Sequence, residues 1–417
     1  MLTQVEGSEA VAHAIAACRP EVICAYPISP QTHIVEGLSR LVKDGSLQGC
    51  EYVNVESEFA AMSVAIGASA AGARSYTATA SQGLLFMAEA VYNASGLGLP
   101  IVMTVANRAI GSPINIWNDH SDALSQRDSG WIQLYADANQ SAVDLHLQAF
   151  RIAEAVSVPV MVCMDGFILT HAYERVDLPS QEQVDAFLPA FEPRQVLDPD
   201  DPVTIGAMVG PEAFSEVRYL AHAKQMQALD LIPQVADEFA EVFGRRSGGH
   251  LRPYRTDDAE TIVVAMGSVL GTIDDVVDEL REDGVAVGSL GITCFRPWPM
   301  DEIREALAGA KRVVVLERAL AVGIGGVVGQ NVRTSLAGTD AVTYDVVAGL
   351  GGRPITKASL HAMLADARAD ALAPLSFLDM NWDLVRNELE RMRAGGRTGP
   401  HEQNLLRDIG IVAARPV

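Results

Sequence analysis

Glu58 is the first residue of this chain whose type and surroundings suggest chemistry. It follows the apolar run Tyr52–Val55 and opens a stretch with no further charge until Arg74. A carboxylate at the start of a helix is favoured electrostatically, and there it can hold or transfer a proton. Glu56 lies two residues earlier, and spacing alone does not separate the two acids. An ordinary capping or first-turn glutamate is the structural alternative.

Arg108 is the second candidate, because it comes directly after the apolar run Ile101–Ala106. A guanidinium group there can form a two-pronged bond to a carboxylate, which indicates a carboxylate-bearing ligand. We expect His120 to be a hydrogen-bonded loop histidine rather than a metal ligand, since no second His or Cys stands at ligand spacing. Four further residues of this segment are expected to form an internal ion network: Asp119, Asp122, Arg127 and Asp128.

Two loops add hydroxyl groups and small side chains. In the loop YPISPQT, residues 26–32, two prolines stiffen the backbone, and Ser29 and Thr32 supply hydroxyls at a helix start. The stretch TATASQG, residues 77–83, would let a ligand approach the backbone closely. An ordinary capped turn and tight packing are the respective structural alternatives.

The elements that position these loops follow a βαβ pattern. Apolar runs typical of strands alternate with helical patterns through the first 170 residues: Val22–Tyr26, Tyr52–Val55, Ser75–Ala80, Ile101–Ala106 and Val158–Met164. This alternation predicts a parallel sheet. Ligands of open parallel sheets bind outside the carboxyl ends of the strands, so we expect the candidate residues to gather at that edge.

The second half of the chain begins with a change of composition. Residues 178–202 are rich in Pro, Asp, Gln and Glu, which predicts a surface excursion, and a long helical pattern follows over Pro211–Phe243. The Gly- and Arg-rich residues 244–260 are the candidate domain boundary, beyond which strands and helices alternate again. The predicted parts are 1–250 with an excursion at about 178–250, a smaller α/β domain at 251–375, and a tail at 376–417 that packs on partner subunits.

Charge and cysteine content exclude several classes of protein. The 417 residues include 31 Lys plus Arg and 53 Asp plus Glu, a net charge of −22, which repels nucleic acid and anionic lipid surfaces. The five cysteines include no CxxC pair, so no zinc or iron–sulfur framework is predicted in this chain. We expect buried thiols in a reducing compartment. Because no signal-peptide pattern is present and no stretch of about 18 residues is continuously apolar, we predict a cytoplasmic protein without membrane insertion.

Taken together, these segments resemble the α subunit of multisubunit pyruvate:ferredoxin oxidoreductases, in the 2-oxoacid:acceptor oxidoreductase family. The resemblance covers about residues 5–355 and rests on motifs in matching order: YPISPQT, NVESEFAAM, TATASQGL, VANRAIGSPINIWNDHSDALSQRDSGWIQLYA and FGRRSGGHLRPYRTDDAETIVVAMGS. It implies a pyrimidine-type thiamine diphosphate-binding domain followed by a transketolase C-terminal-like α/β domain. It also implies reversible oxidative decarboxylation of pyruvate to acetyl-CoA and CO₂, with electrons passing to iron–sulfur clusters and ferredoxin.

The resemblance assigns roles to individual residues. Glu58 matches the glutamate that hydrogen-bonds N1′ of the cofactor's aminopyrimidine, and Arg108 matches the clamp for the substrate carboxylate. Ser29, also a substrate-binding position, stands where relatives often carry Thr, and the missing methyl group leaves room for a larger 2-oxoacid. The residues expected to contact the cofactor are Tyr26, Pro27, Glu58, Thr79, Ser81 and Gln82.

Several parts of the implied enzyme are missing from this chain. It lacks the GDG motif with a following Asn that holds Mg²⁺ and the diphosphate in thiamine enzymes, so these are expected on a partner subunit, and no metal ligand is assigned here. The implied partners are β-, γ- and δ-type subunits that carry the clusters, a 2-oxoacid, coenzyme A, and a ferredoxin-type acceptor docking on another subunit.

Two alternatives stay open beside this interpretation. The same chemistry could act on phenylglyoxylate, 2-oxoisovalerate, 2-oxoglutarate or oxalate, or the chain could be a non-catalytic scaffold subunit. The glycines of GIGG, residues 323–326, open a helix after an apolar strand, but GxGxxG is incomplete, so close packing is expected there rather than a dinucleotide.

Overall fold

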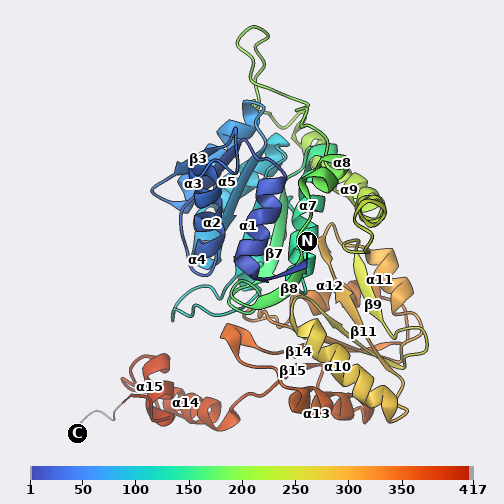
Figure 1. Cartoon of the computed structure of the whole chain (residues 1–417). Coiled ribbons are helices and arrows are strands. Elements are labelled where there is room, and N and C mark those ends of the chain that lie inside the picture. The colour runs from blue at the N-terminus through green and yellow to red at the C-terminus, as the bar shows by residue number, and fades with distance from the viewer. Residues whose placement is uncertain (1, 413–417) are drawn as a thin grey trace.

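A computed structural model of the chain describes residues 2–412. Two β-sheets flanked by helices lie side by side, and the C-terminal helices, red in Figure 1, are set apart from both. The first sheet contains seven strands in the order β12-β6-β7-β5-β4-β2-β3, and the second contains six in the order β15-β14-β13-β10-β11-β9. The predicted α/β class with parallel sheets is therefore confirmed.

In the first sheet, all neighbouring strands are parallel except the edge pair β12 and β6. Its strands are β2 (Val22–Ala25), β3 (Glu51–Asn54), β4 (Ser75–Thr79), β5 (Val102–Asn107), β6 (Ile132–Tyr135), β7 (Val160–Asp165) and β12 (Cys294–Arg296). The central strands β5 and β7 are buried along their whole length, as expected for parallel strands covered on both faces. Five of these seven strands start within two residues of the first residue of an apolar run predicted from the sequence.

The helices of this half are α1 (Gly7–Ala17), α2 (Thr32–Lys43), α3 (Glu58–Ala70), α4 (Ser81–Phe86), α5 (Ala88–Leu97), α6 (Ser121–Ser125), α7 (Asn139–Val156), α8 (Gln181–Phe187) and α9 (Phe214–Phe243). The predicted excursion includes α8, which buries Val184 and Phe187. The ring of Phe187 packs edge-on against Phe239 of α9, and α9 in turn lies along α7. An antiparallel pair formed by β1 (Leu2–Glu6) and β8 (Tyr173–Asp177) ties the chain's beginning to residues before the excursion.

The second sheet has strands β9 (Leu251–Tyr254), β10 (Thr261–Ala265), β11 (Val287–Ile292), β13 (Arg312–Glu317), β14 (Val342–Val347) and β15 (Leu375–Phe377). Its helices are α10 (Val269–Glu282), α11 (Met300–Ala306), α12 (Val328–Ser335) and α13 (Lys357–Arg368), and α14 (Trp382–Ala394) and α15 (His401–Asp408) form the separate C-terminal pair. Strand β12 follows β11 along the chain yet completes the first sheet, so backbone pairing crosses the division predicted near residue 250. No helix in the described range is long and apolar enough to cross a membrane.

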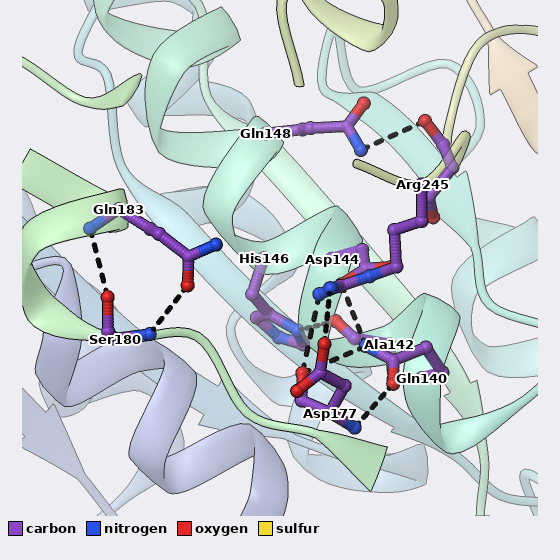
Figure 2. Close-up of polar contacts among 10 residues, drawn as sticks. Gln140, Ala142, Asp144, His146, Gln148, Asp177, Ser180, Gln183 and Arg245 are labelled. Carbon is purple, nitrogen blue, oxygen red and sulfur yellow. Dashed lines mark hydrogen bonds and ion pairs between the residues drawn. The ribbon is translucent and has the colours of Figure 1, made fainter. Parts of the chain in front are cut away.

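Arg245 anchors the connector between the two sheets to α7, as Figure 2 shows. Its guanidinium group donates to Asp144, with Nη2 to Oδ1 at 2.6 Å, and to Oδ2 of Asp177 at 3.1 Å. Gln148 of the same helix donates to the carbonyl of Ser247 at 3.1 Å. The start of the connector is thus held against the first half of the protein by charge-assisted hydrogen bonds.

A buried hydrogen-bond chain runs through the core beside α7. The Nδ1 of His146 lies 2.6 Å from the carbonyl of Ala142, and its Nε2 lies 2.6 Å from Oγ1 of Thr104, which contacts the hydroxyl of Tyr76. Burial lowers the pKa of His146 from 6.5 to about 4, against the opposing bond to Ala142. The neutral imidazole is therefore the form that the folded protein keeps.

We predict that His146 makes the fold less stable as the pH falls from about 6.5 to about 4, because the unfolded chain then binds a proton that the folded chain refuses. The full effect amounts to about 3 kcal/mol. Asp122, whose pKa is raised to about 6 mainly by burial, has the opposite effect on stability over this pH range, because the folded protein binds its proton more readily than the unfolded chain does. The measurement is therefore the difference in thermal midpoint between wild type and His146→Gln. As the pH falls, the midpoint of wild type should drop relative to that of the variant. A difference that stays constant with pH would contradict the assignment.

Candidate active site

The candidate residues gather at the carboxyl ends of β2, β3, β4 and β5. These four strands are parallel and adjacent, in the order β5-β4-β2-β3, so the loops that follow them meet at one edge of the first sheet. The expected location is confirmed by this topology, and it is the location where parallel sheets bind ligands.

Glu58 is the first residue of α3, next to Ser57, whose hydroxyl caps the helix by accepting from the amide of Ala60 at 3.2 Å. Glu58 is buried, whereas Glu56 is exposed. The ideal Cβ position on Gly83 lies 2.8 Å from Oε1 of Glu58. Within the described residues, no hydrogen bond or ion pair engages the Glu58 carboxylate, so it is an acid out of bulk solvent that keeps its bonding capacity for a ligand.

Thr79 borders the same space. Its Oγ1 lies 2.7 Å from the ideal Cβ position on Gly83 and is a buried polar atom without a partner among the described residues. A buried hydroxyl that is left unpaired costs free energy unless a ligand or water satisfies it. Gly83 has no side chain to fill the gap between Thr79 and Glu58, so the three residues form a small polar cradle.

Arg108 lies on the other side of these loops and is 9% exposed. Its Nη1 donates to the carbonyl of Ser29 at 2.9 Å, and its Nε donates to the carbonyl of Asn115 at 3.4 Å. Burial lowers the pKa of Arg108, and the nearby Asp122 opposes that effect, but a guanidinium group stays protonated in proteins. No carboxylate of the described chain lies within ion-pair distance of this group, so it is available to an anionic ligand.

Asp122 joins the loops from inside. Its carboxylate accepts from the backbone amides of Ser81 and Arg108, both at 2.9 Å, from the side chain of Asn107 at 2.8 Å and from the amide of Ala123 at 2.7 Å. Burial raises the pKa of Asp122 to about 6, although all four hydrogen bonds favour the charged form. This residue positions the loops of two neighbouring strands relative to each other.

The expected ion network of this segment is wrong. Asp122 faces inward to amide donors, and Asp119 accepts from the amide of Ser121 at 2.8 Å. Arg127 and Asp128 approach each other at 3.9 Å, near the limit for an ion pair. Buried N–H groups compete for carboxylates more effectively than exposed arginines do, because they have no water to bind instead.

The other predicted residues lie around this centre. The hydroxyl of Ser81, a residue with φ of +51°, contacts the carbonyl of Ala109 and the side chain of Gln82, whose amide donates to the carbonyl of Gly111 at 3.3 Å. The exposed rim of the site contains Tyr26, Pro27 and Ser29. Buried Gln31 was not singled out from the sequence. Its side-chain amide donates to the carbonyl of Tyr26 at 2.9 Å and to that of Ala78 at 3.2 Å, and so links the loop after β2 to β4.

Asp165, at the end of β7, forms a second buried cluster. It lies 2.6 Å from Nε2 of His120 and accepts from Nη1 of Arg318 at 2.7 Å and from the amide and hydroxyl of Ser268. Burial alone would raise the pKa of Asp165, but His120 and Arg318 outweigh it and hold the pKa well below its ordinary value. The expectation that His120 is a hydrogen-bonded loop histidine is confirmed.

Before α12, the backbone at Gly326 packs against Glu317 of the same chain. Glu317 accepts from the amides of Val327, Val328 and Gly329 at 2.7 to 3.1 Å, which are the amides that open the helix. The ideal Cβ position on Gly326 lies 2.0 Å from Oε1 of Glu317. The expected close packing is confirmed at Gly326 and at Gly325, whose ideal Cβ position lies 3.1 Å from Leu375, but not at Gly323, whose ideal Cβ position meets no atom of the described residues within 4 Å. The amides that would bind a dinucleotide phosphate already bind a carboxylate.

Comparison with known proteins agrees with this geometry. Residues 13–237 match the family described as pyruvate flavodoxin/ferredoxin oxidoreductase, thiamine diP-bdg, and residues 259–360 match pyruvate:ferredoxin oxidoreductase core domain II. The chain belongs to the pyruvate:ferredoxin oxidoreductase family. The pyruvate synthase subunit PorA of Methanosarcina barkeri is 48% identical over 392 residues, which cover 91% of this chain and 97% of that protein.

Other family members are similar at comparable length. PorA of Pyrococcus furiosus is 41% identical, covering 92% of this chain and 98% of its own, and the ketoisovalerate oxidoreductase subunit VorA of Pyrococcus abyssi is 40% identical, covering 87% and 93%. A solved 2-oxoglutarate:ferredoxin oxidoreductase from Magnetococcus marinus, with 2-oxoglutarate, coenzyme A and succinyl-CoA bound, has a TM-score of 0.65 at 20% identity. That alignment covers 88% of this chain and 65% of the solved one, and shows a shared fold.

Within this family framework, the Asp165 cluster joins the two matched regions. Asp165 and His120 belong to the thiamine-binding match, whereas Ser268 and Arg318 belong to core domain II. The cluster therefore fixes one family domain against the other through a buried carboxylate.

We predict that Arg318→Met lowers the free energy of unfolding by about 3 to 5 kcal/mol, because the buried carboxylate of Asp165 loses its guanidinium partner. Thermal unfolding of the purified chain measures the change. The control is Arg19→Met, which removes an exposed pair with Asp185 and should cost less than about 1 kcal/mol. Equal shifts in both variants would show that the Asp165 cluster does not hold the two domains together.

Proposed function

We propose that this chain is the α-type subunit of a thiamine diphosphate-dependent pyruvate:ferredoxin oxidoreductase, which oxidatively decarboxylates pyruvate, reversibly, to acetyl-CoA and CO₂. The observation that carries the proposal is the buried, unpartnered carboxylate of Glu58 beside the orphaned hydroxyl of Thr79, at the carboxyl ends of parallel strands. The similar PorA proteins are named pyruvate synthase subunits, which supports pyruvate as the 2-oxoacid.

The residues present fit the aminopyrimidine end of the cofactor. Thiamine diphosphate, when bound, stabilises the carbanion that forms when a 2-oxoacid loses CO₂. Glu58 would hold a proton at N1′ of the ring, and Thr79 would satisfy a second polar atom there. Gly83 leaves the space that a side chain would otherwise occupy. Ser81 and Gln82 shape the adjoining loop, while Tyr26 and Pro27 border the site from its exposed rim.

The substrate carboxylate would bind to Arg108. The contact of its Nη1 with the carbonyl of Ser29 orients the guanidinium group, and the lack of a nearby protein carboxylate leaves its charge for the substrate. The hydroxyl of Ser29 would face the same ligand. A second candidate substrate is 2-oxoisovalerate, which the similar VorA protein and the small side chain at position 29 favour.

The remaining parts of the enzyme are proposed to come from partner subunits. A β-type subunit would bind Mg²⁺ and the diphosphate, because this chain has no GDG motif with a following Asn, and other subunits would hold the iron–sulfur clusters that reduce ferredoxin. All five cysteines are buried and unpaired, which supports this division and a reducing, cytoplasmic location. Exposed apolar side chains after Arg108 support a covering partner: Ile114, Ile116 and Trp117. The C-terminal pair α14 and α15 likewise exposes Met392 and Leu406, and exposed Ile411 follows α15.

We predict that Glu58→Gln in the assembled complex lowers pyruvate oxidation by several powers of ten, because general acid–base contributions are worth about 10² to 10⁴. Viologen reduction with pyruvate and coenzyme A measures the rate. Exposed Glu56 is the matched control, and Glu56→Gln should leave turnover unchanged.

Two glycine variants test the same cradle without replacing the acid. Gly83→Ala should disturb both Glu58 and Thr79 and lower turnover, whereas Gly67→Ala on the same helix as Glu58 meets no atom within 4 Å. Full activity of the Glu58→Gln complex would favour the scaffold alternative over the catalytic one.

We predict that Arg108→Met lowers kcat/KM for pyruvate by about ten- to a hundredfold, mainly through KM, because a charge-assisted pair with the substrate is lost. Steady-state assays over pyruvate, 2-oxoisovalerate, phenylglyoxylate, 2-oxoglutarate and oxalate measure the effect and rank the substrates. Arg127→Met, in the same segment, should leave KM unchanged. A KM unaffected by the Arg108 variant would remove this residue from the substrate site.

A further inference from the structure

Three side chains that are distant in sequence meet beside the two-stranded sheet. Glu6 ends β1, His33 lies on the first turn of α2, and His171 lies just before β8. Each offers one ligand atom, and these atoms all lie within 4.8 Å of one another. Nδ1 of His33 contacts Oε1 of Glu6 at 2.6 Å, and the two imidazole rings have centroids 4.7 Å apart. We propose that this cluster binds one divalent transition-metal ion of the zinc type.

The donor set determines the class of ion. Two imidazole nitrogens and one carboxylate oxygen suit Zn²⁺ and its neighbours, whereas Mg²⁺ and Ca²⁺ require mostly oxygen ligands. Ligands bound at about 2.0 to 2.2 Å around a tetrahedral ion lie roughly 3.4 Å apart. The observed separations of 2.6 Å and up to 4.8 Å bracket this distance, so small side-chain rotations bring all three donors to one ion.

His171 is already oriented by its neighbours. Its Nδ1 lies 2.7 Å from Oγ1 of Thr170, a hydroxyl that also accepts from the amide of Phe167 at 2.8 Å. The ring of Phe167 packs against the imidazole at a centroid distance of 4.8 Å. Because Nδ1 is engaged, Nε2 is the nitrogen of His171 directed to the ion, and a hydrogen bond of this kind to the second nitrogen is typical of metal-ligating histidines.

An ion can reach the cluster from solvent. The side chain of His33 is 48% exposed and that of Glu6 is 18% exposed, which leaves room for water as a fourth ligand. The bound ion would join β1 to α2 and to the turn at residues 167–172. Since α2 begins directly after the loop with Ser29, the bound ion would stabilise the position of that loop. Its role would be structural, and it would not take part in the reaction.

Cobalt binding to the untagged, EDTA-treated full-length chain tests the proposal. Titration with Co²⁺ alone should give visible absorption that saturates at one ion per chain, and elemental analysis after dialysis against Zn²⁺ should find the same ratio. Bound metal should raise the thermal midpoint of the wild-type chain. These readings need neither thiamine diphosphate nor turnover, so their failure is distinct from failure of the proposed function.

Single variants connect the signal to the cluster. His33→Ala, His171→Ala and Glu6→Gln should each weaken Co²⁺ binding at least about tenfold and abolish the metal-dependent rise in thermal midpoint. The matched control is His361→Ala, which removes an exposed histidine paired with Glu279 at 2.7 Å and should bind as wild type does. Since His33 is half exposed, its variant should fold even if His171→Ala does not. The proposal would be overturned if wild type bound Co²⁺ no more strongly than His33→Ala does. It would also be overturned if His361→Ala lost as much Co²⁺ binding as the cluster variants.

Discussion

The geometry of the candidate site depends on one buried carboxylate, that of Asp122. It accepts four N–H bonds, from the loop after β4, from the loop after β5 and from its own helix. A carboxylate inside a protein is costly unless such donors surround it, and conversely the donors would be unsatisfied without it. Because the backbone at residues 81 and 108 binds the same carboxylate, the polar cradle around Glu58 and the guanidinium group of Arg108 keep a defined relation to each other.

A second carboxylate acts in the same way at a larger scale. Asp165 stands at the end of a first-sheet strand and binds groups from both halves of the protein. Both acids accept from donors that leave the regular hydrogen bonding of the sheet, Asp165 at the end of β7 and Asp122 on α6, the helix that follows β5. Glu317 likewise accepts from the backbone amides at the start of α12.

The sequence predicted the parallel sheet and the position of the candidate loops because apolar runs report burial on both faces directly. It placed Glu58 and Arg108 after strands of the same parallel sheet for the same reason. It did not predict the role of Asp122, since its donors come from loops that only the strand order brings together, and charged neighbours in sequence suggested a different pairing. Similarly, no local motif connects Glu6, His33 and His171. The pairing of β1 with β8 brings Glu6 near His171, and α2 adds His33.

The antiparallel edge formed by β12 has a consequence for how this polypeptide can be divided. A fragment that ends near residue 250 would keep β6 but lose the strand that covers it. Exposed strand edges recruit other strands, so such a fragment would tend to self-associate although every ligand-facing loop is intact. On the ribosome, the same dependence means that the first sheet stays open on one side until the chain has been synthesised past Arg296.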